Sequence, residues 1–290
     1  MLIDAHNHPH YYGYSGQALL QNMDEQGIDK MWLLSWEIPQ EEYQVRTYQH
    51  QLSATATSGI PLDDVVDVSR EAPERFVLGY APHPKRPDAI GRIRAAVDIY
   101  GIRLAGEYKS RTAFDDPDSI QLLRVFGELG LPVTIHLQYP VHDERSTHPR
   151  GSYWYGGTIG ALERAVIACP ETVFIGHGQG WWAHISDDDL FDKEMYPNAP
   201  VKPGGANPAL LEKYPNLYAD LSATSGYTAL TRDPEFGRQY LIDHSDKLLF
   251  ARDIYDNKLM DHLKTLDLPS DASDKIMYGN AEKLVGAAHA

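Results

Sequence analysis

The chain begins with histidines and an aspartate at alternate positions, in the stretch "IDAHNHPH" of residues 3–10. In an extended strand, side chains two residues apart point to the same face and lie about 6.6 Å apart. Two imidazoles at this spacing can converge on one metal ion, which takes histidine nitrogens at about 2.0 to 2.1 Å. A polar chain start that is rich in histidine is the alternative. The residues on the shared face are Asp4, His6, His8 and His10.

Polar residues of metal-ligating types also end later apolar runs of the chain. In a parallel barrel, the side chains at the carboxyl ends of the strands meet and form the active site. A histidine buried in the core explains any one of these positions, but it explains poorly why five strands end in such residues. The sequence therefore predicts a metal site assembled from several strands. After His6 and His8, the residues at these ends are Glu107, Lys109, His136, His177 and Asp253.

Short apolar runs alternate with helical patterns along the whole chain. This alternation indicates βαβ units and a parallel sheet, and eight units in about 250 residues match a (β/α)8 barrel. A doubly wound open sheet is the second interpretation, but no glycine-rich phosphate loop follows the first run. We expect one α/β domain, a (β/α)8 TIM barrel, over residues 1–290. The expected strands lie at 1–6, 30–36, 75–82, 102–108, 131–138, 172–178, 216–222 and 247–253.

Composition excludes several classes of partner. The 290 residues carry a formal net charge of −15, whereas a protein that binds nucleic acid needs a basic face. The one cysteine, Cys169, excludes an intramolecular disulfide, which suits a reducing compartment. Neither a run long enough to span a membrane nor a signal segment is found. We expect a cytoplasmic protein that acts on a small molecule, without nucleic-acid or membrane partners.

Several short motifs in order resemble the amidohydrolase superfamily, in particular amidohydrolase family 2 with its aminocarboxymuconate-semialdehyde decarboxylase-like enzymes. The motifs are "DAHNH", "TIH", "IGHG", "FARD" and "YGNAEKL", and they cover almost the whole chain. The resemblance implies a distorted (β/α)8 barrel, a divalent metal (zinc first, manganese as the alternative) and a homodimer. It also implies a role for His177 in polarising substrate or water. By position, the metal ligands it implies are His6, His8, His136 and Asp253.

Two positions depart from the family pattern. "FARD" replaces a more common Phe-Gly-Ser-Asp and leaves Asp253 in place, whereas "GEYK" at the fourth strand is less typical. Superfamily members with two metals use a carboxylated lysine or a glutamate there as a bridge. Glu107 is accordingly a further candidate ligand and Lys109 a candidate substrate-binding residue, while a Glu107–Lys109 ion pair in the pocket wall is the alternative. The rest of the sequence resembles the mononuclear branch.

The leading functional hypothesis is hydrolysis of a small, carboxylate-bearing ester, lactone or amide by a metal-activated water. Asp253 would transfer the proton of that water to the leaving group, and His177 would polarise the carbonyl oxygen. Metal-dependent non-oxidative decarboxylation in the same site is the alternative. A barrel that binds metal without catalysis is a third hypothesis. Such a protein would be expected to lack a metal ligand or the proton-transferring residue, and the sequence lacks neither.

Two long segments follow strands that end in histidine. Residues 137–157 are aromatic and basic, and the loop after the sixth strand holds Trp181. Such long loops are usually functional or disordered, and aromatic content argues against disorder. We predict a lid or wall in which Arg145 and Arg150 pair with a substrate carboxylate and Trp181 stacks on the substrate. A packed surface loop or a subunit contact is the alternative.

Overall fold

The computed structural model describes residues 1–39, 42, 52, 59–141 and 153–286, in which strands and helices alternate. Each of the eight predicted runs coincides with one parallel strand, and β1 extends one residue beyond its run. A short antiparallel pair, β3 (Trp36–Glu37) and β4 (Gly59–Ile60), is additional. The eight parallel strands are β1 (Ile3–Asn7), β2 (Lys30–Leu34), β5 (Phe76–Gly79), β6 (Ala105–Tyr108), β7 (Val133–His136), β8 (Phe174–His177), β9 (Leu217–Asp220) and β10 (Leu248–Leu249).

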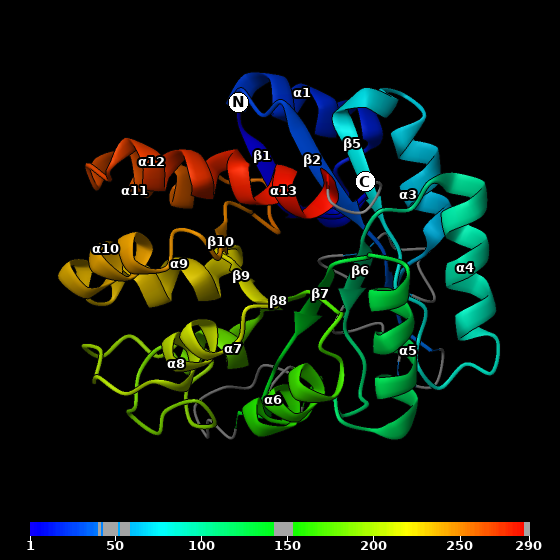
Figure 1. Ribbon diagram of the computed structural model, residues 1–290. Coiled ribbons are helices and arrows are strands. Elements are labelled where there is room, and N and C mark those ends of the chain that lie inside the picture. Colours follow the sequence, from blue (N-terminus) through cyan, green and yellow to red (C-terminus); the bar gives the residue numbers. More distant parts are fainter. Residues whose placement is uncertain (40–41, 43–51, 53–58, 142–152, 287–290) are drawn as a thin grey trace.

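Backbone hydrogen bonds join these strands into the predicted (β/α)8 barrel. The strands form one sheet in the order β1-β2-β5 and another in the order β10-β9-β8-β7-β6. At one seam, the Ala5 N–H donates to the Phe250 carbonyl at 3.0 Å and the Asp253 N–H to the His6 carbonyl at 2.9 Å. At the other, the Tyr80 N–H donates to the Leu104 carbonyl at 3.0 Å. The strands therefore lie at the centre, with the helices around them (Figure 1).

Helices follow most of the strands, as the pattern predicts. The first helix shows why, since the Ser15 hydroxyl accepts from the Ala18 N–H at its start and Gly27 ends it in the left-handed conformation. The helices are α1 (Gly16–Gln26), α3 (Leu62–Ser69), α4 (Ala89–Tyr100), α5 (Pro117–Glu128), α6 (Ile159–Ala168), α7 (Gln179–Ala183), α8 (Ala206–Lys213), α9 (Ala223–Thr231), α10 (Pro234–Asp243), α11 (Lys258–Thr265), α12 (Ser270–Asp274) and α13 (Asn280–Gly286). Among the described residues, no helix is long and apolar enough to cross a membrane.

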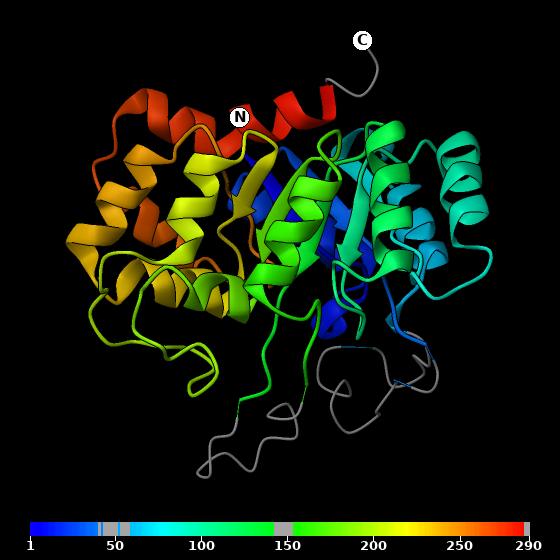
Figure 2. The same cartoon turned by 60° about the horizontal axis from the view of Figure 1, so that its bottom comes forward.

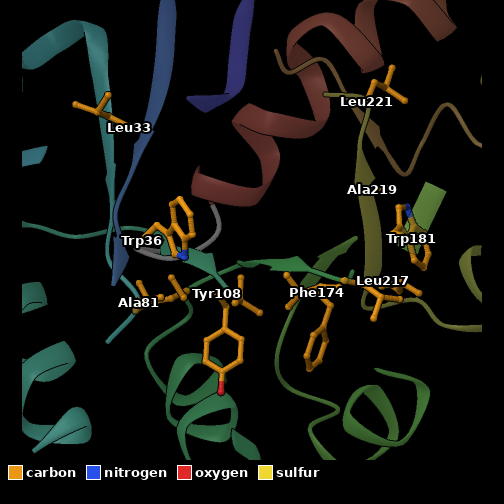
Figure 3. Packing of buried hydrophobic residues seen from close by; sticks show 14 of the residues in the cluster. Leu33, Trp36, Ala81, Tyr108, Phe174, Trp181, Leu217, Ala219 and Leu221 are labelled. Carbon is orange, nitrogen blue, oxygen red and sulfur yellow. The ribbon is translucent and has the colours of Figure 1, made fainter. Parts of the chain in front are cut away.

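Two hydrophobic clusters support the barrel and leave one of its ends polar. The larger lies between strands and helices, and Figure 3 shows Trp181 in it beside Leu217 and Ala219. The smaller joins strand residues such as Ile3 and Ile175 to Leu284 of α13. α13 lies near the N-terminus of the chain, at the end of the barrel where β1 begins (Figure 2). The carboxyl ends of the strands lie at the opposite end.

Candidate metal centre

The side chains of His6 and His8 bring their Nε2 atoms together at the end of β1, with the two rings nearly perpendicular. Their Nε2 atoms are 3.2 Å apart, and both side chains are buried. The Nδ1 of His8 donates to the Leu34 carbonyl at 2.8 Å, and the Nδ1 of His6 donates to an Asp220 oxygen at 2.8 Å. Holding Nδ1 in this way leaves the lone pair on Nε2. Two such lone pairs repel at this distance unless a proton or a cation lies between them.

Asp4 and His10 do not join this pair, although regular alternation places all four residues on one face. The register of β1 against β2 shifts between Asp4 and Asn7, which breaks the alternation after Asp4. His10 lies beyond the end of β1 at Asn7, with a left-handed φ of 57°. The Asp4 carboxylate instead accepts from the Arg252 Nε at 2.7 Å and from the Asn7 side chain at 3.1 Å. The shared-face expectation therefore holds for His6 and His8 alone.

Glu107 lies between two groups of histidines. Its Oε2 is 3.5 Å from the Nε2 of His8. Its Oε1 is 2.6 Å from the Nδ1 of His136 and 3.5 Å from the Nε2 of His177. The ion pair with Lys109 is also present, with 3.7 Å between Oε1 and Nζ. The two sequence interpretations of Glu107 are thus compatible, because one buried carboxylate makes both sets of contacts.

Asp253 approaches the same histidines from the end of the last barrel strand. Its Oδ1 is 3.4 Å from the Nε2 of His8 and 3.7 Å from that of His6, and its Oδ2 is 3.7 Å from the Nε2 of His177. Its φ of 57° is left-handed, a conformation that costs a non-glycine residue about 1 to 2 kcal/mol. The surrounding contacts maintain this strain, which is common at functional sites.

Six residues of the site form three overlapping groups of three. Within each group, the ligand atoms lie within 4.8 Å of one another. No group among the described residues combines His136 with His6 or His8. His136 instead lies with Glu107 and His177, so the four-residue set that the family resemblance implies is spread over all three overlapping groups. Glu107 belongs to the group with His8 and to the group with His136. This donor set of imidazoles and carboxylates fits one or two divalent cations. The groups are His6–His177–Asp253, His6–His8–Glu107 and Glu107–His136–His177.

Asp220 at the end of β9 contacts the site, although it is not among the residues predicted from the sequence. It is fully buried, and its Oδ2 accepts from the Nδ1 of His6 at 2.8 Å. Its Oδ1 accepts from the Nδ1 of His177 at 3.0 Å and from the Ser222 hydroxyl at 2.6 Å. One carboxylate therefore orients two imidazoles. The signal was available, because "YAD" ends an apolar run just as the other strand-end motifs do.

The buried carboxylates of the site are ionised. Burial raises the pKa of Glu107, but the charges of Lys109 and His136 outweigh it and hold that pKa well below its usual range. Burial also opposes ionisation of Asp220, yet His177 and His6 hold its pKa far below normal. The pKa of Asp253 is lowered in the same way. Buried anions need compensating positive charge, which a divalent cation could supply.

The histidines differ in charge. Burial lowers the pKa of His8, but hydrogen bonds and charges from Asp253 and Glu107 reverse this and raise it to about 9. For His177, Asp220 outweighs burial and raises the pKa. Burial and the charge of Lys109 lower the pKa of His136 to about 4. The Nε2 of His177 is also buried without a hydrogen-bond partner among the described residues.

A pocket of about 80 Å³ opens onto the site, and Asp253, His136 and Lys109 lie in its wall. The Nζ of Lys109 lies 3.8 Å from the centre of the Trp36 ring, so the ammonium group is held against an aromatic face. The segment after β7 supplies part of the wall, as predicted for a loop at the rim. The remaining wall is polar and aromatic and includes Tyr11, Tyr12, Gln138, Tyr153, Tyr155, Gln179 and Tyr196.

Trp181 is not brought to this pocket. It is fully buried in α7, where a Cβ on Gly176 would lie 2.5 Å from its ring, so the indole packs directly on the β8 backbone. Because α7 begins directly after Gly178, the chain turns Trp181 into the core rather than out over the site. Arg145 and Arg150 lie outside the residues that the structure describes.

Comparison with known proteins agrees with this arrangement. The sequence model of the amidohydrolase family (Amidohydro_2) matches residues 3–287. An uncharacterised TIM-barrel protein from Bordetella bronchiseptica is 16% identical, with a TM-score of 0.65 over 100% of this chain and 99% of that one. No curated protein matches.

Two further solved structures resemble the chain in fold. A probable 2-pyrone-4,6-dicarboxylic acid hydrolase from Acinetobacter baumannii, with citric acid bound, is 12% identical (TM-score 0.57, 98% of this chain, 99% of that one). A dihydroxybenzoic acid decarboxylase from Polaromonas sp. JS666, with bound manganese and the inhibitor 2-nitroresorcinol, is 16% identical (TM-score 0.57, 100% and 98%). At these identities the likeness concerns the fold, whereas the family match spans nearly every residue. The chain belongs to the amidohydrolase family.

Proposed function

We propose that this protein is a metal-dependent hydrolase that acts on a small, carboxylate-bearing ester, lactone or amide. One observation carries the proposal. The Nε2 atoms of His6 and His8 face one another at 3.2 Å, with an oxygen of Asp253 3.4 Å from His8. Asp253 also lies in the wall of the pocket. This combination joins a chelating pair, a carboxylate base and access for a substrate.

The chain's own residues fit a divalent cation, with zinc as the first candidate and manganese as the second. His6, His8 and Asp253 would hold it, with His136 and Glu107 as the further ligands. When bound, such an ion lowers the pKa of a coordinated water from about 15.7 towards about 7. The fit rests on the facing Nε2 atoms and on the ionised carboxylates around them.

Asp253 and His177 have the positions and charges that proton transfer requires. The lowered pKa of Asp253 keeps it ionised, so it can take a proton from the attacking water and give it to the leaving group. The raised pKa of His177 favours a proton on Nε2, which can be donated to the carbonyl oxygen under attack. Its Nδ1 is fixed by Asp220 at 3.0 Å, which directs Nε2 towards the centre.

Lys109 is our candidate for binding a substrate carboxylate. It lies in the pocket wall, and its side chain is 11% exposed, so its charge is only partly screened by water. The names of both similar enzymes contain a carboxylic acid, and the hydrolase holds citric acid. Arg145 and Arg150 keep the same role as a prediction from sequence.

Non-oxidative decarboxylation is the second candidate, favoured by the similarity in fold to the dihydroxybenzoic acid decarboxylase. The same residues serve that chemistry. Lys109 would hold a carboxylate, and Asp253 or His177 would relay a proton to carbon as carbon dioxide leaves. The two candidates therefore differ in product rather than in site.

The test is a product screen with one protein preparation. Metal-depleted protein is reloaded with zinc or manganese and offered lactones, esters, amides and aromatic carboxylic acids, while acid release and carbon dioxide are both recorded. Metal-dependent acid release that Asp253→Asn abolishes supports hydrolysis, and carbon dioxide release supports the second candidate. Lys109→Met should raise KM, whereas the exposed Lys264→Met serves as the matched control. Bound metal without any turnover would contradict both candidates.

A further inference from the structure

A second charged group lies beside the metal centre and takes no part in it. Arg252 directly precedes Asp253, and its side chain is 2% exposed. Its Nε donates to the Oδ2 of Asp4 at 2.7 Å, and its backbone N–H donates to the Oδ1 of Asp4 at 2.9 Å. The Nε bond fixes the guanidinium by one edge and the Asp4 carboxylate compensates its charge, while the backbone bond holds that carboxylate in place.

The terminal nitrogens of this guanidinium indicate a ligand-binding site. Both terminal nitrogens, Nη1 and Nη2, are buried without a hydrogen-bond partner among the residues that the structure describes. Buried donors are nearly always satisfied. The two terminal nitrogens of a guanidinium match the two oxygens of a carboxylate in a bidentate pair.

Arg252 lies in the wall of a cavity of about 200 Å³, which is several times the roughly 30 Å³ that one water occupies in the liquid. Thr224 and Thr228 add hydroxyl donors to this wall. Lys258 and Asp256 also line it, and they pair with each other at 3.5 Å. Arg252 is therefore the charge in this wall whose terminal donors are left for a ligand.

The cavity adjoins the metal pocket, because Ala223, Thr224 and Ile254 line both. We propose that this second cavity binds a small carboxylate, held end-on by Nη1 and Nη2 of Arg252 and by the threonine hydroxyls. Two sources share that chemistry. One is a separate small carboxylic acid, and the other is a carboxylate on a substrate that extends from the metal pocket past Thr224.

Two variants separate the site from the fold. Arg252→Lys keeps a positive charge near Asp4 but removes the two-pronged donor. Thr228→Phe fills the cavity from α9 and leaves the Arg252–Asp4 contact in place. The matched control is Arg92→Lys, because Arg92 also donates its Nε to an aspartate at 2.7 Å, but at the surface. His6→Ala/His8→Ala removes the paired imidazoles and so separates this site from the proposed metal function.

The primary measurement is the thermal unfolding midpoint in sodium acetate against sodium chloride at equal ionic strength. We expect acetate to raise the midpoint of the wild type, of Arg92→Lys and of His6→Ala/His8→Ala. At least half of the rise should be lost in Arg252→Lys and in Thr228→Phe. An equal rise in all five proteins would overturn the proposal, and so would no rise in any of them.

Crystals grown with 4-bromobenzoate, whose aryl bromide does not alkylate histidine or cysteine, give an independent readout through the anomalous signal of bromine. The proposal predicts a bromine peak in the cavity, with the carboxylate on Arg252, and its loss in Thr228→Phe. Water alone on the terminal nitrogens of Arg252 would refute it. A raised KM for the substrate in Thr228→Phe, at unchanged metal content, would support the site and identify the ligand as part of the substrate. An unchanged KM in Thr228→Phe, together with loss of its acetate effect, would support a separate acid.

Discussion

Asp220→Asn tests how the imidazoles of the metal centre are held. In the wild type, one ionised carboxylate accepts from the Nδ1 of His6 at 2.8 Å and from that of His177 at 3.0 Å. An asparagine offers only one accepting oxygen, and its amide nitrogen donates rather than accepts. The ring that faces the amide must then carry its proton on Nε2, where it can no longer bind a metal.

The expected loss follows from this geometry. Removing the hydrogen-bond partner of a ligating histidine typically weakens metal binding by about 10- to 100-fold. Because Asp220 serves two rings, we expect the upper end of that range, about 100-fold or about 2.8 kcal/mol. Zinc affinity is measured by competition with a chromophoric chelator, and the fold is checked by circular dichroism.

Asp246→Asn is the matched control, because Asp246 is a 75% exposed carboxylate at the surface. It should bind zinc as the wild type does. If Asp220→Asn also kept wild-type affinity while folded, the contacts of Asp220 would not be what positions His6 and His177, and our reasoning on the site would fail.

Three further predictions concern metal number and pH. The resemblance to mononuclear members predicts one zinc per chain in the wild type, and Glu107→Gln should retain it. If elemental analysis instead found two ions in the wild type and one in Glu107→Gln, Glu107 would be identified as a bridging ligand. Nearby carboxylates raise the pKa of His8 to about 9, so zinc must displace a proton to bind. Zinc affinity should therefore rise about tenfold per pH unit from pH 7 to 9 and then level off. Calorimetry in buffers of different ionisation enthalpy should detect the released proton, and a pH-independent zinc affinity would contradict this. Burial, only partly offset by Asp188, lowers the pKa of His184 to about 4. Its contribution to stability is therefore complete above pH 6.5 and is lost as pH falls towards 4. Between pH 7 and 5 the loss in the free energy of unfolding amounts to about 2 kcal/mol. Urea unfolding should show this loss in the wild type and not in His184→Gln. Equal losses in both proteins would contradict the prediction.

Much of the fold was predictable because both of its periodicities are local. Seven of the eight parallel strands fall inside a predicted apolar run, and β1 extends one residue beyond its run. Ser15 and Gly27, residue types that favour a helix start and a helix end, bound α1. α9 was not predicted, because its sequence "ATSGYTALT" is rich in residues with weak helix propensity. Its contacts with α7 and α10 stabilise it, and such contacts are not visible in a local pattern.

The parts of the site that depend on where strands end were predictable. The parts that depend on the direction of individual side chains were not. His6, His8, Glu107, His136 and Asp253 all lie where apolar runs stop, and the barrel brings them together. The register shift in β1 that separates Asp4 from His6 depends on pairing with β2, which the sequence of one strand does not encode. Likewise, the inward turn of Trp181 depends on contact with Gly176.

The number of metal ions per chain tests the central claim most directly. Wild-type protein and His6→Ala/His8→Ala are dialysed to equilibrium against the same free zinc concentration and analysed for metal. Our account predicts at least one zinc per wild-type chain and less than about a tenth of that in the folded double variant, because the paired Nε2 atoms are its core. Full zinc content in the double variant would contradict the assignment of the metal centre.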